Sequence, residues 1–131
     1  MAYLNKEQIL SAQDILYEDV AVPEWGGTVR VKTLNGAERD SLEQSMIDKK
    51  GKDSSMNMAN FRAKLCSKTI VDEAGKRLFT DLDILDLGKK SGAALQRVFN
   101  VASRLSGFSS NDIEELTKNS ESSQSEDSGT V

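Results

Sequence analysis

Residues 22–34 read VPEWGGTVRVKTL, a turn followed by a regular alternation of side chains. In an extended chain, Val29 and Val31 lie on one face, whereas Arg30 and Lys32 lie on the other. A period of two is typical of a β-strand that buries one face and exposes the opposite one. The stretch therefore predicts a strand that contributes its valines to the core.

The residues before this strand complete a β-hairpin. Apolar side chains recur over residues 14–22, and Gly26 and Gly27 can supply a turn between the two extended segments. Pro23 is tolerated there because the outer edge of a hairpin leaves some N–H groups unpaired. We predict a hairpin over residues 14–34 with Trp25 near its tip.

The rest of the chain carries helix patterns, in which apolar residues recur at steps of three and four after a polar cap. The predicted caps include Asn5, with Gln8 three positions later, Asn35, with Glu38 three positions later, and Thr80. They predict helices at about residues 5–12, 36–49, 56–69 and 80–88, one between Gly92 and Gly107, and a last one from Ser109 or Ser110 to about Thr117. Residues 51–55 are predicted to form a loop, and residues 70–79 a short second hairpin or a strand-like link. The expected fold is α+β and mostly helical, with an N-terminal β-hairpin followed by about five short-to-medium helices.

Three of these helices carry several apolar side chains, which are predicted to face the core in the helix at 56–69. In the helix at 56–69 they are Met58, Phe61, Leu65 and Thr69, with Ala59, Ala63 and Cys66 beside them. The short helix at 80–88 contributes Leu82, Ile84, Leu85 and Leu87. The helix after Gly92 has the most regular stripe, formed by Leu95, Val98, Ala102 and Leu105 with Phe99 alongside.

The length of 131 residues fits one domain with a substantial core. Residues 119–131 contain one apolar side chain larger than a methyl group, at the C-terminal end. Because such a segment buries too little surface to offset the entropy of ordering, it predicts a disordered acidic tail. We expect a single α+β domain over residues 1–118 and a tail over residues 119–131.

Charge and cysteine content disfavour several classes of protein. The formal net charge is −4 and there is no long basic run, so no nucleic-acid partner is expected. No stretch reaches the roughly 20 apolar residues that cross a bilayer, so no membrane partner is expected either. The one cysteine cannot form an internal disulfide, and the N-terminus lacks a secretory pattern, which favours a reducing cytoplasm.

The sequence offers few residues for catalysis or metal binding. It has no histidine, the commonest general base and transition-metal ligand. Cys66 lies beside an apolar stripe, which favours a buried thiol over a nucleophile. Asp81, Asp83 and Asp86 lack the glycine and final glutamate of a calcium-binding loop, so helix-start charge is the better interpretation. We expect no enzyme activity, no metal and no cofactor.

The remaining candidate function is binding through apolar surface. Trp25 is either a core anchor or an exposed binding residue, since tryptophan is common in both settings. The stripe formed by Leu95, Val98, Phe99, Ala102 and Leu105 is either an internal seam or a groove for a partner helix. The sequence favours the core interpretation of both features, and the partner-binding interpretation stays open.

The last two helices could also imitate a helix-turn-helix motif that binds DNA. The second of them, at residues 111–118, contains Asp112, Glu114 and Glu115 and would be repelled by phosphates. This interpretation is therefore weak.

The order of these pieces resembles the tail assembly chaperones of long-tailed bacteriophages, especially those that infect Gram-positive hosts. The likeness covers roughly residues 12–119 and depends on the order of four segments, because none is diagnostic alone. They are residues 22–40, with the strand-to-helix sequence LNGAERD at 34–40, residues 71–80, residues 87–91 and residues 95–99. The chain departs from the family pattern at Asn35, where threonine is expected, but both residues cap helices.

The resemblance implies a non-catalytic protein that binds the long helical tape measure protein and keeps it soluble during tail assembly. The tail tube protein is a further implied partner, and self-association is expected because one small domain covers little of so long a client. The implied location is the host cytoplasm, with the chaperone absent from the mature virion.

Two other functions compete with this one. The chain could be a small structural tail or head-completion protein that stays in the virion. It could instead be a non-enzymatic regulatory adaptor that binds nucleic acid through its last two helices. An enzyme is the least favoured class.

Overall fold

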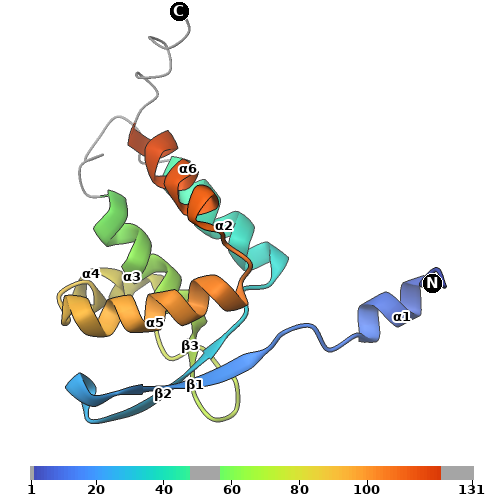
Figure 1. The fold of residues 1–131 in the computed structure, drawn as a ribbon, viewed down its shortest axis with the longest axis horizontal. Coiled ribbons are helices and arrows are strands. Elements are labelled where there is room, and N and C mark those ends of the chain that lie inside the picture. The colour runs from blue at the N-terminus through green and yellow to red at the C-terminus, as the bar shows by residue number, and fades with distance from the viewer. Residues whose placement is uncertain (1, 48–56, 122–131) are drawn as a thin grey trace, which may run out of the picture.

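The computed structural model describes residues 2–47 and 57–121 (Figure 1). Its helices and strands are α1 (Lys6–Ser11), β1 (Tyr17–Val22), η1 (Pro23–Trp25), β2 (Gly27–Lys32), α2 (Gly36–Ile47), α3 (Asn57–Thr69), β3 (Ile70–Val71), η3 (Asp81–Asp83), α4 (Ile84–Leu87), α5 (Gly92–Leu105) and α6 (Ser110–Glu121). The fold is α+β and mostly helical, which confirms the predicted class. The predicted loop at 51–55, the tail beyond Glu121 and the side chains of Met58 and Ala59 lie outside the described residues.

The predicted hairpin is the pair β1 and β2. Its antiparallel register places Val20 opposite Val29, with both side chains toward the core. A single 3-10 turn, η1, joins the strands and ends at Gly26, whose φ of 79° lies in the left-handed region that favours glycine. Gly27 belongs to the strand and pairs with Val22, so only one of the two glycines makes the turn.

The segment after α3 adds a third strand to the sheet. Ile70 of β3 pairs with Val31, which gives the strand order β1-β2-β3. The segment also folds back on itself, because Val71 forms a β-bridge with Arg77 and the Asp72 N–H donates to the Lys76 carbonyl at 2.8 Å. This return agrees with the hairpin alternative of the two predicted for residues 70–79, and the pairing with β2 is an addition that the local pattern did not predict.

Helices α2 to α6 lie on one side of this sheet (Figure 1). Helix α5 packs on β1 and β2 and against α3, while α2 and α6 lie side by side further from the strands. Phe61 of α3 is fully buried among them, with edge-to-face ring contacts to Phe99 at 5.7 Å and to Phe108 at 6.1 Å between centroids. Such aromatic pairs add to the stabilisation that burial alone provides.

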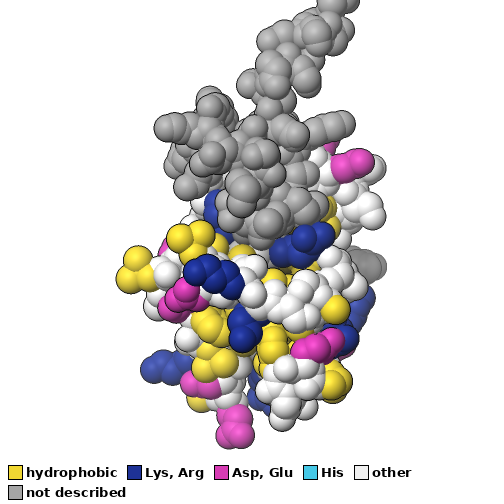
Figure 2. All heavy atoms as spheres, turned by 90° about the vertical axis from the view of Figure 1, so that its left-hand side faces the viewer, with side chains coloured by type: hydrophobic (Ala, Val, Ile, Leu, Met, Phe, Trp, Pro, Cys, Tyr) yellow, Lys and Arg dark blue, Asp and Glu magenta, His cyan; other side chains and the backbone are white. Residues whose placement is uncertain are grey.

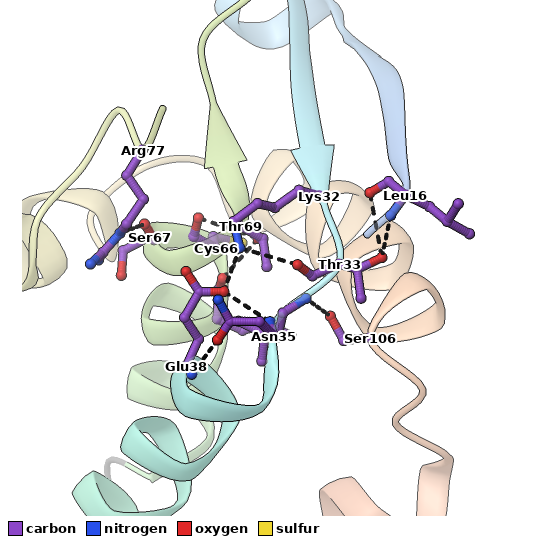
Figure 3. A network of polar contacts seen from close by, with 12 residues as sticks. Leu16, Lys32, Thr33, Asn35, Glu38, Cys66, Ser67, Thr69, Arg77 and Ser106 are labelled. Atoms are coloured by element: carbon purple, nitrogen blue, oxygen red, sulfur yellow. Dashed lines mark hydrogen bonds and ion pairs between the residues drawn. The ribbon is translucent and has the colours of Figure 1, made fainter. Parts of the chain in front are cut away.

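A set of polar contacts joins the sheet to α2 and α5 (Figure 3). The Asn35 side chain accepts from the Glu38 N–H at 2.8 Å, and Glu38 accepts from the Asn35 N–H at 2.9 Å, which confirms the predicted helix cap. The same Glu38 carboxylate receives the ammonium of Lys32, whose side chain is buried. The Leu34 N–H donates to the Ser106 hydroxyl at 3.0 Å and so ties the end of the hairpin to α5.

A helix lies near each end of the described chain. Helix α6 begins after Ser109, whose hydroxyl accepts from the Asp112 N–H at 3.0 Å, and it runs to Glu121 rather than stopping near Thr117. At the other end, α1 has the predicted capping box between Asn5 and Gln8. Within the described ranges, no helix combines the length and the apolar character that a bilayer crossing requires.

Residues 2–13, which we call the N-terminal arm, project away from the body of the molecule (Figure 1). None of the residues of α1 is buried. The arm nevertheless carries four large apolar side chains with high exposure, at 99% for Tyr3, 67% for Leu4, 56% for Ile9 and 75% for Leu10.

Candidate protein-binding surface

The stripe of α5 faces the interior of the protein. Leu95, Val98, Phe99 and Ala102 are buried, and Leu105 is partly buried against the same core. The internal-seam interpretation therefore describes this helix in the isolated chain. A role of these residues in partner binding stays a prediction, and it would require the stripe to become accessible.

Cys66 is also an interior residue. It is fully buried, and its Sγ lies 3.9 Å from the carbonyl oxygen of Leu95. Loss of hydration raises the pKa of the Cys66 thiol to about 12, because burial disfavours the thiolate. This environment matches the predicted buried thiol and does not activate a nucleophile.

Trp25 lies between the two settings that the sequence left open, and a role in partner binding stays a prediction. It ends the turn η1 and packs against the core while staying half-buried. Its indole N–H is buried without a hydrogen-bond acceptor among the described residues. The exposed part of the ring lines an open pocket of about 360 Å³.

This pocket lies between the hairpin tip and α4. Three apolar side chains from distant parts of the sequence line it, namely Trp25, Phe79 and Leu87. Asp83, Asp86 and Lys90 complete the lining. A mostly apolar hollow with a few polar groups at its rim is the usual form of a binding site for a side chain or small ligand.

Two exposed leucines lie on the same segment of chain as three of the pocket residues, Asp83, Asp86 and Leu87. Leu82 has 91% of its surface exposed and Leu85 has 74%. Both leucines alternate along the chain with the pocket residues Asp83, Asp86 and Leu87, but neither of them lines the pocket itself. We call the pocket together with Leu82 and Leu85 the end surface. Figure 2 looks at this end of the molecule, where hydrophobic side chains lie among charged ones.

Some charged side chains at or beside the end surface form ion pairs or hydrogen bonds within the protein, and others form no ion pair with a described residue. Asp81 accepts a hydrogen bond from Arg77 at 3.2 Å, which lowers the pKa of that carboxyl, and Lys68 lies 3.6 Å away. Asp83 accepts from the Thr80 N–H at 2.8 Å as a helix cap. By contrast, Asp86 and Lys90 form no ion pair with any described residue. The rim thus offers one free carboxylate and one free ammonium.

The sequence did not predict that Leu82 and Leu85 would be exposed, because it placed both on the short helix without assigning either to a face. Residues three apart share a helix face, so Leu82 and Leu85 form one stripe while Ile84 and Leu87 form another. Only Leu87 is fully buried and Ile84 is half-buried, because a short helix on the surface can turn one stripe inward. The two separate stripes were the signal that could have identified the exposed pair.

The site has the composition of a surface that binds another polypeptide. Within residues 2–47 and 57–121, no three potential metal-ligating side chains come together. Apolar area, an exposed aromatic ring and a charged rim are instead the features of protein interfaces.

The sequence matches the family described as phage tail assembly chaperone over residues 5–119. No curated protein matches it at a significant level. Among solved structures, the chain resembles the tail assembly chaperone of bacteriophage HK97, with a TM-score of 0.57 and 18% sequence identity over 76% of this chain and 94% of that chain. At this identity the likeness concerns the fold alone. On the extent of the family match, the chain belongs to the phage tail assembly chaperone family.

Proposed function

We propose that this protein binds the tape measure protein of its phage and keeps it soluble until the tail tube assembles around it. The observation that carries the proposal is the family match over residues 5–119. A tape measure protein is a long, helical and amphipathic client by the resemblance described above. Its apolar stripe needs a partner surface before the tube encloses it.

The end surface provides a place for such a helix. Its pocket of about 360 Å³ can receive a large apolar side chain, and the exposed Leu82 and Leu85 offer further apolar area on the same segment of chain. Helices commonly dock in this way, with apolar residues at steps of three and four inserted into a hydrophobic groove. Masking of this kind requires no catalytic residue.

Co-expression with the tape measure protein of the same phage tests the proposal. Wild-type protein is expected to hold the client in the soluble fraction and to elute with it. Leu82→Asp and Trp25→Ala should weaken that complex, whereas Leu16→Asp should not, since Leu16 is 57% exposed and does not line the pocket. An insoluble client in the presence of wild-type protein would contradict the proposal.

We also propose that the protein acts in the host cytoplasm, in several copies per client, and is absent from the mature virion. Mass spectrometry of purified particles separates this from the alternative of a structural subunit. A chaperone leaves no stoichiometric peptide signal in the particles, whereas a tail or head-completion protein does.

A further inference from the structure

The pocket of the end surface has apolar walls and a polar rim. Trp25, Phe79 and Leu87 form the apolar part, and Asp83, Asp86 and Lys90 supply the polar groups. Two of the three apolar side chains are aromatic. An apolar side chain of a client would match the walls but would leave the carboxylates without a partner. A side chain that fills this pocket well therefore has to satisfy both kinds of group.

The carboxylates at this end of the molecule differ in how far they are engaged. Asp81 is paired with Arg77 at 3.2 Å and does not line the pocket. Asp83 uses its Oδ2 atom to accept from the Thr80 N–H at 2.8 Å and from the Thr80 hydroxyl at 3.3 Å. The exposed carboxylate of Asp86 accepts no hydrogen bond and forms no ion pair within residues 2–47 and 57–121. Asp86 is therefore the carboxylate that is available to a ligand.

The lining of the pocket carries an excess of negative charge. Asp83 and Asp86 contribute two carboxylates and Lys90 contributes one ammonium, which leaves one negative charge in excess. A helix that docks on this rim removes water from it. A carboxylate that loses its water without gaining a partner weakens binding, because burial of an unpaired charge is costly. A cation supplied by the docking helix removes this cost.

The aromatic walls provide a second attraction for a cation. The face of an aromatic ring is electrically negative, and tryptophan attracts the charged ends of arginine and lysine most strongly. Long basic side chains also have an apolar stem that packs on apolar surface while the charged end stays at the rim. Arginine suits such a place best, because its planar and weakly hydrated guanidinium stacks on rings and pairs with carboxylates.

We propose that the pocket takes a basic side chain of the client helix, preferentially an arginine, with Asp86 as its ion-pair partner. The stem of this side chain contacts the apolar walls, and apolar residues of the same helix can contact Leu82 and Leu85. The inference rests on the proposed function for the identity of the client. The chemistry of the pocket belongs to this chain and can be tested without the client.

The fluorescence of Trp25 measures binding at the pocket, since it is the one tryptophan of the chain. The probes are two synthetic amphipathic helical peptides without aromatic residues, which differ at one position beside the apolar stripe. One has arginine there, and the other has citrulline, which has nearly the same shape and no charge. Wild-type protein should bind the arginine peptide about tenfold more tightly, through the ion pair and the cation–π contact together. The preference should shrink between about 0.05 M and about 1 M salt.

Asp86→Asn gives the decisive comparison. Because Asp86 is exposed, the variant should fold as wild type does, which circular dichroism checks. It should bind the citrulline peptide as wild type does and keep at most about a threefold preference for arginine, from the rings alone. Lys90→Gln removes the competing ammonium and should enlarge the preference. Glu7→Gln removes one negative charge from α1, outside the pocket, and should behave as wild type.

Three results would each overturn the inference. They are equal binding of the two peptides by wild-type protein, binding of neither peptide, and a full preference for arginine in Asp86→Asn.

Co-expression with the tape measure protein separates this inference from the proposed function. If wild-type protein prefers the arginine peptide but leaves the client insoluble, the proposed function is wrong and the chemistry of the pocket stands. If wild-type protein keeps the client soluble but binds the two peptides equally, the proposed function stands and the arginine site is wrong.

Discussion

Arg97 of α5 and Glu24 of the turn η1 form a bidentate ion pair. Nη1 of Arg97 lies 2.5 Å from Oε1 of Glu24, and Nη2 lies 3.0 Å from Oε2. The two residues are 73 positions apart in the sequence. The pair therefore holds the hairpin tip, which carries Trp25 and one wall of the pocket, against the helix that forms the core seam.

Glu24→Gln should change how stability depends on pH. The hydrogen bond from Arg97 lowers the pKa of Glu24 from 4.5 to about 2. A carboxyl whose pKa is depressed by folding stabilises the native state above its unfolded pKa, and this contribution disappears as the pH falls toward the folded pKa. Thermal melts from pH 6 to pH 2, at about one-unit steps, should show a shallower loss of stability for the variant. Glu7→Gln in the arm is the control, and an equal effect there would contradict the prediction.

Leu95→Asp should lower the free energy of unfolding strongly and Leu82→Asp hardly at all, although the chemical change is the same. Leu95 is 5% exposed, so the variant buries an unpaired carboxylate, at a cost of more than about 4 kcal/mol. Leu82 is 91% exposed, so its variant should stay within about 0.5 kcal/mol of wild type. Urea unfolding followed by circular dichroism measures both. A folded Leu95→Asp protein would show that α5 is not an internal seam.

Cys66 should resist thiol reagents in the native protein. Burial raises the pKa of the Cys66 thiol to about 12, so little thiolate forms near neutral pH, and the side chain is fully buried. A maleimide or disulfide reagent at about pH 8 should label it slowly in buffer and at once in denaturant. Rapid labelling of the folded protein would contradict the interior position of α3.

Glu38→Ala should destabilise the protein more than Glu43→Ala. Glu38 accepts from the Asn35 N–H at 2.9 Å and also pairs with the buried ammonium of Lys32, which would lose its carboxylate. Leaving a largely buried charge and a helix cap unsatisfied costs about 2–4 kcal/mol. Glu43 pairs with Arg39 at 3.1 Å on the surface of α2, where such pairs contribute about 0.3–0.5 kcal/mol. Urea unfolding of the two variants provides the comparison.

The elements that sequence predicted well are those set by neighbouring residues. The hairpin around Gly26 and the caps at Asn5, Asn35 and Thr80 depend on side chains within a few positions of one another. The interactions that determine these elements are therefore all formed within a short stretch of sequence. For the same reason the internal seam of α5 could be recognised from its spacing alone.

The features that sequence missed depend on distant parts of the chain. The pairing of Ile70 with Val31 is determined by how α3 returns to the sheet, and nothing near Ile70 specifies its partner. The pocket joins Trp25, Phe79 and Leu87, which are brought together only by the tertiary fold. Periodicity identified Leu82 as an apolar residue on a helix, but only its position on the body determined that it faces outward.

The position of β1 at the rim of the sheet affects how the protein can aggregate. Rim strands expose backbone donors and acceptors that can recruit strands from other molecules and seed fibres. Here Glu18 and Asp19 lie next to each other in that strand. Glu18 accepts from Arg104 at 2.9 Å, and Asp19 accepts from Arg30 at 3.0 Å. Pro23 follows the last residue of the strand. Charge and an absent N–H discourage strand recruitment, so this rim of the sheet should resist the seeding of fibres.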